Sequence, residues 1–330
     1  MISLYRWLLP FLVAALPMST VFADSNNNDT RIWLERMNTA LRALNYEGNF
    51  VYIFDNNLGS MRVIHRADND GGMEHLISLT GTQREVIRDH KEVMSILPSD
   101  HSVLIERRYM AAHYPVPIPQ AIHETKLIAF YKFKYLGEDR VAGHACKIID
   151  IQPRDNYRYG YRLWLDNNNG MLLRSDLLNK NGKIIVRIMF TSITYPHEIP
   201  DDAFKATELK PGYIWNIQGG RERLIKADAG LNWNAPQLPP GFSLSMDNMQ
   251  RLVGTSSPVR HLVYSDGLAS VSVFVEMAKP GRKELIGPSQ MEAVSAFGRR
   301  VGNHSITVVG EVPPETVEII AQAMRLQPQS

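Results

Sequence analysis

The residue types best suited to catalysis lie together in the stretch HLVYSDGLASVSVFVE, residues 261–276. His261 precedes the adjacent Ser265 and Asp266, and a histidine, a serine and an aspartate make up the catalytic triad of many hydrolases. Successive side chains of an extended strand point to opposite faces, so three neighbours in one hairpin rarely converge. Asp266-Gly267 between two apolar runs is also a typical hairpin turn. The stretch therefore favours a turn over a hydrolase site.

Other motifs for catalysis or cofactor binding are absent from the sequence. It contains no HExxH or HxH pattern, no GxSxG elbow, no GxGxxG fingerprint and no Walker loop. The ten histidines are scattered, and Cys146 is the one cysteine, so we expect neither a zinc site nor an internal disulfide. We predict no catalytic residue, no metal ligand and no cofactor. Paired carboxylates acting on a glycoside remain an alternative.

Composition excludes several classes of protein. The chain of 330 residues is 44% hydrophobic and 21% charged, with a net charge of +2, which is typical of globular domains. From residue 231 onward, eight Lys and Arg balance eight Asp and Glu. A nucleic-acid surface needs a basic bias, so we expect no nucleic-acid partner.

The first 23 residues have the pattern of a secretory signal peptide. A positive charge precedes the apolar run WLLPFLVAALPM, and Val21 and Ala23 occupy the −3 and −1 positions of a cleavage site. We predict cleavage after Ala23. The alternative, a membrane anchor, is disfavoured by Pro10 and Pro17 within the run.

The rest of the chain reads as one helix followed by hairpins, then a second region of strands with a terminal helix. RIWLERMNTALRAL has apolar residues at helical spacing, and hairpin turns are expected at 89–91, 166–170 and 179–182. Consecutive hairpins favour an antiparallel sheet. In PPETVEIIAQAMRL, Val317, Ile320 and Met324 mark the buried helix face.

A Gly- and Pro-rich stretch divides the chain. We place a linker at 213–231, between a large domain at 24–212 and a small β-rich domain at 232–330.

Two strands of the large domain carry the candidate ligand site. NFVYIFD, residues 49–55, is apolar on both faces, whereas a sheet with one wet face alternates apolar and polar residues. A helix covering such a sheet leaves room for an apolar cavity that suits an acyl chain. The alternative is an ordinary core. The predicted lipid-binding residues of this strand and of YRLWLD are Phe50, Tyr52, Phe54, Tyr161, Leu163 and Leu165.

Two basic pairs in the small domain are candidate contacts for an acidic partner. They are Arg282-Lys283 and Arg299-Arg300. A solvated surface is the alternative for each pair.

Several segments, in order, resemble one family. Behind the signal peptide, LNYEGNFVYIF, TGTQREVIRDHKEV, HLVYSDGLASVSVFVE and SITVVGEVPPETVEIIAQAM are similar to segments of the periplasmic sigma-E regulatory proteins of the RseB/MucB family. The resemblance implies a mainly β fold with helices (α+β). Its large domain would be an incomplete antiparallel β-barrel holding helices, similar to the lipoprotein carriers LolA and LolB. The small domain would be an antiparallel sheet with a C-terminal helix.

The resemblance also implies a function. Family members are periplasmic regulators without enzymatic activity. They bind the periplasmic segment of a membrane-spanning anti-sigma factor of the RseA or MucA type, shield it from proteolysis, and release it when lipid or lipopolysaccharide binds. A homo-oligomer is possible. The alternative is a periplasmic carrier of lipid or lipoprotein, which has no need of residues 232–330.

Overall fold

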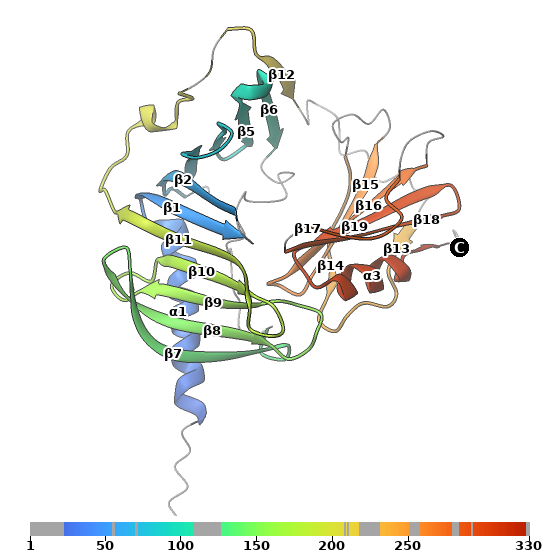
Figure 1. The fold of residues 1–330 in the computed structure, drawn as a ribbon, viewed down its shortest axis with the longest axis horizontal. Coiled ribbons are helices and arrows are strands. Elements are labelled where there is room, and N and C mark those ends of the chain that lie inside the picture. Colours follow the sequence, from blue (N-terminus) through green and yellow to red (C-terminus); the bar gives the residue numbers. More distant parts are fainter. Residues whose placement is uncertain are drawn as a thin grey trace, which may run out of the picture.

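The computed structural model contains two main β-sheets, a two-stranded sheet and two α-helices in the part of the chain that it describes (Figure 1). The described residues are 23–54, 57–69, 72–107, 127–207, 209, 211–217, 232–250, 258–278, 284–291 and 293–327. Among these residues, no helix is long and apolar enough to cross a membrane.

The large sheet has twelve strands in the order β12-β6-β5-β4-β3-β2-β1-β11-β10-β9-β8-β7. Its strands are β1 (Tyr46–Phe54), β2 (Asn57–Arg66), β3 (Met73–Ser78), β4 (Glu85–Arg88), β5 (Glu92–Leu97), β6 (Ser102–Arg107), β7 (Tyr131–Val141), β8 (His144–Pro153), β9 (Gly160–Asp166), β10 (Leu172–Leu178), β11 (Ile184–Thr194) and β12 (Ile214–Ile217). Hairpins connect most neighbours, so the pairing is antiparallel except between β6 and β12. The end strands β7 and β12 do not pair, so the barrel is open, which confirms the expected incomplete barrel.

Helix α1 (Ala23–Ala43) lies against the large sheet and contacts β7 and β10 (Figure 1). Leu34, Met37 and Ala40 are buried in the core cluster of this sheet, at the helical spacing that the sequence predicts. The outer face of β2–β6 is covered by the segment after β11, which includes Ile199, Phe204 and the 3₁₀ helix η2 (Asp201–Phe204). In this part of the sheet, both faces carry buried apolar residues.

The predicted turns lie where the sequence places them. β4 and β5 flank residues 89–91, β9 and β10 flank 166–170, and β10 and β11 flank 179–182. One difference concerns the expected linker at 213–231, because its first residues form β12 and pair with β6 of the large sheet. Residues 218–231 of the linker lie outside the described residues.

The small sheet has six strands in the order β14-β15-β16-β19-β18-β17, and β13 pairs with β20 beside it. The strands are β13 (Asn232–Asn234), β14 (Ser243–Gln250), β15 (Val259–Ser265), β16 (Ser270–Met277), β17 (Gly287–Met291), β18 (Val294–Val301), β19 (His304–Gly310) and β20 (Arg325–Gln327). Helix α3 (Pro314–Ala323) packs on β18 and β19 (Figure 1). Val317, Ile320 and Met324 are buried, as predicted.

Candidate functional site

The six predicted lipid-binding residues lie on one face of the large sheet. Strand register aligns Tyr52 of β1 with Ile188 of β11, Ser175 of β10 and Leu163 of β9. It likewise aligns Phe54 with Tyr161 through β11 and β10. Phe50 lies two residues before Tyr52, and Leu165 lies two residues after Leu163. Residues two apart on a strand point to the same face, so Phe50 and Leu165 share it. The sequence pattern therefore selected residues that the fold brings together.

Burial divides the six residues into two groups. Phe50 is 3% exposed, Tyr161 is 8% exposed, and Leu163 and Leu165 are fully buried, so these four belong to the core beneath α1. Tyr52 and Phe54 are half-buried, and their rings stack with centroids 5.7 Å apart. The core alternative thus describes the first group well, whereas the stacked pair is accessible to a ligand.

A small apolar cavity lies between α1 and this face. It has a volume of about 30 Å³ and is lined by Leu41, Tyr46, Phe50, Val63, Glu74, Leu76, Met171, Leu172, Ile188 and Phe190. That volume equals the share of a single water molecule in the liquid, so no acyl chain fits in this state. Leu41 of α1 forms one wall of the cavity.

One carboxylate faces this otherwise apolar cavity. Glu74 lines it and forms an ion pair of 3.1 Å with Arg88, and both side chains are buried. Buried ion pairs of this kind seldom add stability, because desolvation offsets their attraction.

A second buried charge cluster joins the large sheet to the small one. Arg158, which precedes β9, donates to Asp266 Oδ2 at 2.5 Å, and neither side chain is exposed. Arg158 also pairs with Asp155 at 3.0 Å and donates to the carbonyl of Pro240 at 2.5 Å. The hydroxyl of Tyr131, in β7, donates to the same Asp266 oxygen at 2.9 Å. The turn that first suggested catalysis is therefore the contact between the sheets.

Asp266 shapes its own turn as well. Its Oδ1 accepts hydrogen bonds from the backbone N–H groups of Leu268 (2.8 Å) and Ala269 (2.7 Å). Ser265 Oγ donates to the Ala269 carbonyl, whereas His261 Nε2 lies 3.0 Å from Ser272 Oγ. His261, Ser265 and Asp266 thus do not form a triad, and the hydrolase alternative built on them is wrong.

Apolar and polar contacts extend this interface. Leu268 packs against the core cluster that contains Leu127, and Ala293 is buried within it. Thr316, in the first turn of α3, donates to the carbonyl of Tyr157 at 2.7 Å. Three separate segments of the C-terminal part, around residues 240, 266 and 316, therefore attach to the large sheet.

A titratable carboxyl is buried near this interface. Burial raises the pKa of Glu311 to about 7. Burial, with a smaller contribution from the nearby Glu311, raises the pKa values of Tyr159 and Tyr161 in the β9 region. A carboxyl with this pKa changes its charge near neutral pH.

The structure describes one of the two basic pairs predicted to bind a partner. Arg282 and Lys283 lie outside the described residues. Arg299 donates to the carbonyls of Ala321 (3.3 Å) and Gln322 (3.1 Å) and so caps the C-terminal end of α3. Arg300 is exposed. Arg299 therefore has a structural role, and Arg300 is the residue of the pair that is available to a partner.

Sequence reasoning missed Arg158 and Tyr131. Arg158 lies among the tyrosines of RDNYRYGYR, a pattern that gives no sign that its guanidinium is buried. Rings of Phe130, Tyr131 and Phe242 lie 4.9, 5.4 and 5.2 Å from that guanidinium. Such cages are built by residues distant in sequence, so only the fold reveals them.

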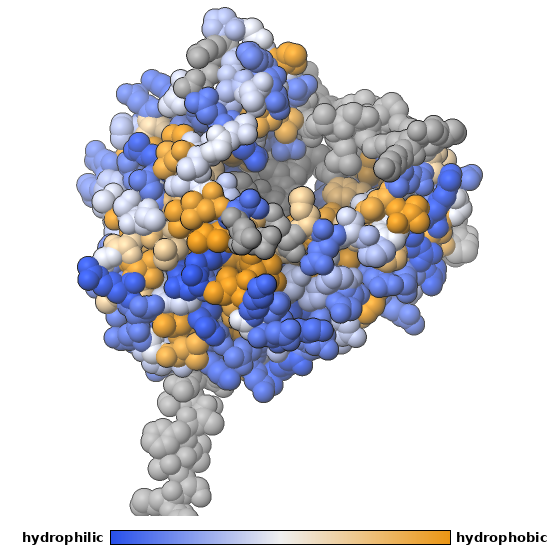
Figure 2. Space-filling model, viewed as in Figure 1, coloured by the Kyte–Doolittle hydropathy of each residue, from blue (hydrophilic) through white to orange (hydrophobic). Residues whose placement is uncertain are grey.

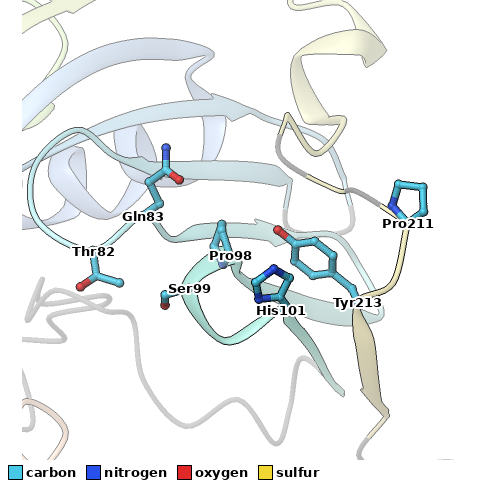
Figure 3. A pocket seen from close by; sticks show the side chains of 7 residues that line it. All are labelled: Thr82, Gln83, Pro98, Ser99, His101, Pro211 and Tyr213. Carbon is cyan, nitrogen blue, oxygen red and sulfur yellow. The ribbon is translucent and has the colours of Figure 1, made fainter.

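A larger, polar pocket lies at the β12 end of the large sheet (Figure 3). Its volume is about 480 Å³, and it is lined by Thr82, Gln83, Pro98, Ser99, His101, Pro211 and Tyr213. The rings of His101 and Tyr213 lie 5.8 Å apart. Among the described residues, no carboxylate, ammonium or guanidinium lines this pocket. The surface in the view of Figure 2 is mostly hydrophilic, with apolar patches scattered among charged residues.

Comparison with known proteins places these features in a family. Residues 29–208 match the family model of the MucB/RseB N-terminal domain, and residues 227–325 match that of the MucB/RseB C-terminal domain.

Two curated relatives span almost the whole chain. The sigma factor AlgU regulatory protein MucB of Pseudomonas aeruginosa is 32% identical, over 90% of this chain and 91% of that protein. The sigma-E factor regulatory protein RseB of Escherichia coli K12 is 27% identical, over 88% of this chain and 89% of that protein.

Solved structures agree. The crystal structure of MucB in complex with MucA(peri) is similar with a TM-score of 0.67 and 29% identity, over 92% of this chain and all of that one. The crystal structure of MucB has a TM-score of 0.65 and 28% identity, over 91% of this chain and 98% of that one.

Proposed function

Because the chain belongs to the MucB/RseB family, we propose that it is a periplasmic negative regulator of a sigma-E pathway. It binds the periplasmic segment of a membrane-spanning anti-sigma factor and shields that segment from proteolysis. In this proposal the signal peptide is removed after Ala23, and the mature chain divides into a large domain that begins at residue 24 and includes β12, and a small domain at 232–330.

One observation carries this proposal. The similarity to MucB in complex with MucA(peri) extends over 92% of this chain, so it includes both sheets. A binding protein that used the large sheet alone, as a simple carrier does, has no need of the small one. The buried contact between the sheets supports a binding surface to which both contribute.

Lipid or lipopolysaccharide releases the partner in this proposal. The apolar face with Phe50, Tyr52 and Phe54 supplies the site, and its cavity of about 30 Å³ is closed in the present state. A ligand that needs an open cavity binds the open state better, and a partner that prefers the closed state is then released. Tyr161, Leu163 and Leu165 complete the proposed face.

The proposed contacts with an acidic partner are Arg300, Arg282 and Lys283, and Arg299 supports them by holding α3. Rim charges of this kind mainly set the rate of association and its dependence on salt.

The test uses the mature chain, residues 24–330, and a labelled peptide of the anti-sigma periplasmic segment from the same genome. Fluorescence anisotropy is expected to give a dissociation constant of about 1 μM or lower, the range of specific complexes. Added lipopolysaccharide is expected to weaken it. Absence of binding at micromolar concentration contradicts the proposal, and lipid transfer between vesicles in that case favours the carrier alternative.

A charge variant distinguishes direct contact with the partner from non-specific binding. Arg300→Gln is expected to slow association, whereas Lys180→Gln, an exposed residue in the turn between β10 and β11, is the matched control and is expected to change nothing.

A further inference from the structure

We propose that Arg158 and Asp266 are positioning residues for partner binding: their buried ion pair sets the orientation of the small sheet on the large one. We further propose that Tyr131 links this pair to the apolar ligand face. The inference rests on the proposed function, and it explains how a ligand on the apolar face changes the binding of the partner.

The first step is the burial of the charges. The side chains of Arg158 and Asp266 are both fully buried, and Asp155 supplies a second, partly exposed carboxylate to the same guanidinium. A buried ion without its partner costs several kcal/mol, whereas the pair itself contributes little net stability. Orientations that bury the interface but separate the two charges are therefore strongly disfavoured. The pair selects one orientation more than it adds to affinity between the sheets.

The second step is directional hydrogen bonding. A guanidinium donates in a fixed plane, and Arg158 uses it for Asp155, Asp266 and the Pro240 carbonyl. Two of these acceptors belong to the C-terminal part of the chain and lie on different segments. Phe242 adds its ring from that same part, with its centroid 5.2 Å from the guanidinium. Two separated attachments on one rigid donor oppose both rotation and sliding of the small sheet.

The third step is the connection to the ligand face. Tyr131 is fully buried in the same core cluster as Phe50 and Leu163, and its hydroxyl donates to Asp266 Oδ2. Burial and the neighbouring Asp266 raise its pKa well above the usual range, so it remains a donor. Tyr131 and Phe133 are two residues apart on β7 and so point to the same face. The strand register aligns Phe133 with Ile151 of β8 and Tyr161 of β9. A chain that enters this face displaces core side chains, and Tyr131 carries the change to Asp266.

The first experiment measures orientation. Lys180→Cys and Ser289→Cys place one spin label on each sheet, while Cys146 is buried with a pKa raised to about 11 and stays unlabelled. Pulsed EPR is expected to give one narrow distance distribution for the labelled chain. The double substitution Arg158→Met with Asp266→Asn is expected to broaden it, because Asn still accepts from the turn N–H groups while both charges are gone.

A matched control has the same chemistry within one sheet. Arg187 pairs with the buried Asp176 at 2.7 Å inside the large sheet, so Arg187→Met with Asp176→Asn also removes a buried Arg–Asp pair. Because Asp176 also pairs with Arg174 at 2.6 Å, this control removes two ion pairs, both within the large sheet, and is still expected to keep the narrow distribution. A distribution for Arg158→Met with Asp266→Asn as narrow as that of the parent overturns the positioning role. If this variant fails to fold, Asp266→Asn alone is measured by the same criterion.

The second experiment measures partner binding. Affinity for the anti-sigma segment is expected to fall about tenfold or more in the interface variant and to stay unchanged in the control. Unchanged affinity in both overturns the proposal. Failure of the parent protein to bind the segment contradicts the proposed function instead, and the EPR result then still decides the positioning role.

The third experiment tests Tyr131. Tyr131→Phe removes only the hydroxyl, so the core stays filled. The factor by which lipopolysaccharide weakens segment binding is expected to shrink in this variant. Tyr195→Phe is the control, because its hydroxyl donates to Asp166 Oδ2 at 3.4 Å and the residue is not part of the proposed ligand face. An unchanged factor in Tyr131→Phe overturns the link.

Discussion

Arg158 and Asp266 are separated by 108 residues in the sequence, yet their side chains form an ion pair of 2.5 Å with no exposure to solvent. One residue precedes a strand of the large sheet, and the other begins a turn of the small sheet. The pair makes the two sheets one body, and the predictions below follow from that relationship and from the apolar face beside it.

Loss of Arg158 alone is expected to destabilise the protein strongly. Arg158→Met leaves Asp266 buried with one hydroxyl donor and two backbone donors but no counter-charge, at a cost of about 3 kcal/mol or more. Urea unfolding followed by tryptophan fluorescence measures the effect. Arg174→Met removes a half-buried partner of Asp176 but leaves its second partner, Arg187, in place. This variant is therefore expected to lose less unfolding free energy. Equal costs for the two variants contradict the special status of the interface pair.

Truncation of the ligand face is expected to separate core residues from accessible ones. Phe50→Ala removes a ring that is 3% exposed and costs about 3–5 kcal/mol of unfolding free energy. Tyr52→Ala affects a half-buried side chain, so its cost is smaller and the fold survives. We expect Tyr52→Ala to weaken lipopolysaccharide-driven release more than segment binding. A titration of both ligands against the variant decides this, and equal losses argue against a ligand role for Tyr52.

Filling the cavity is expected to stabilise the closed state. Val63 lines the cavity of about 30 Å³, and Val63→Ile adds one methylene, worth about 0.8 kcal/mol when buried without strain. Thermal unfolding is expected to move upward while lipopolysaccharide affinity falls. Val273→Ile makes the same change in the small-sheet core, where Val273 is fully buried, and is expected to be neutral or destabilising. A lower melting temperature for Val63→Ile rejects the cavity as a closed ligand site.

Stability is expected to depend on Glu311 between pH 5 and pH 8. Burial raises the pKa of this carboxyl from 4.5 to about 7 in the folded chain, so the folded state binds a proton that the unfolded state has lost. The unfolding free energy therefore rises as pH falls from 8 toward 5, because protonation removes the cost of a buried charge. Glu311→Gln is expected to flatten this dependence and to be the more stable form at pH 8. The exposed Glu318→Gln is the control, and an unchanged pH profile in Glu311→Gln refutes the assignment.

Local patterns predicted much of this structure because they report local physics. The Asp266-Gly267 turn, the doubly apolar strand with Phe50, and the buried face of the terminal helix all follow from spacing within about a dozen residues. Strand alternation even grouped the six ligand-face residues correctly on one face.

The rest depends on contacts between distant segments. Spacing gave no reason to pair Arg158 with Asp266, or β6 with β12 inside the expected linker. The size of the cavity follows from how Leu41 and its neighbours pack, which no pattern encodes. The role of Arg299 was also not predictable, because the sequence of a basic pair on a strand is the same whether the pair binds a partner or caps a helix.

The most direct test of the account is a reciprocal binding measurement on the mature chain. Calorimetry determines the affinity for the anti-sigma segment with and without saturating lipopolysaccharide, and the affinity for lipopolysaccharide with and without saturating segment. A regulator that is released by its ligand must show the same weakening factor, greater than one, in both directions. If each ligand binds equally well in the presence of the other, the chain does not release the anti-sigma segment in response to lipopolysaccharide, and the account is contradicted.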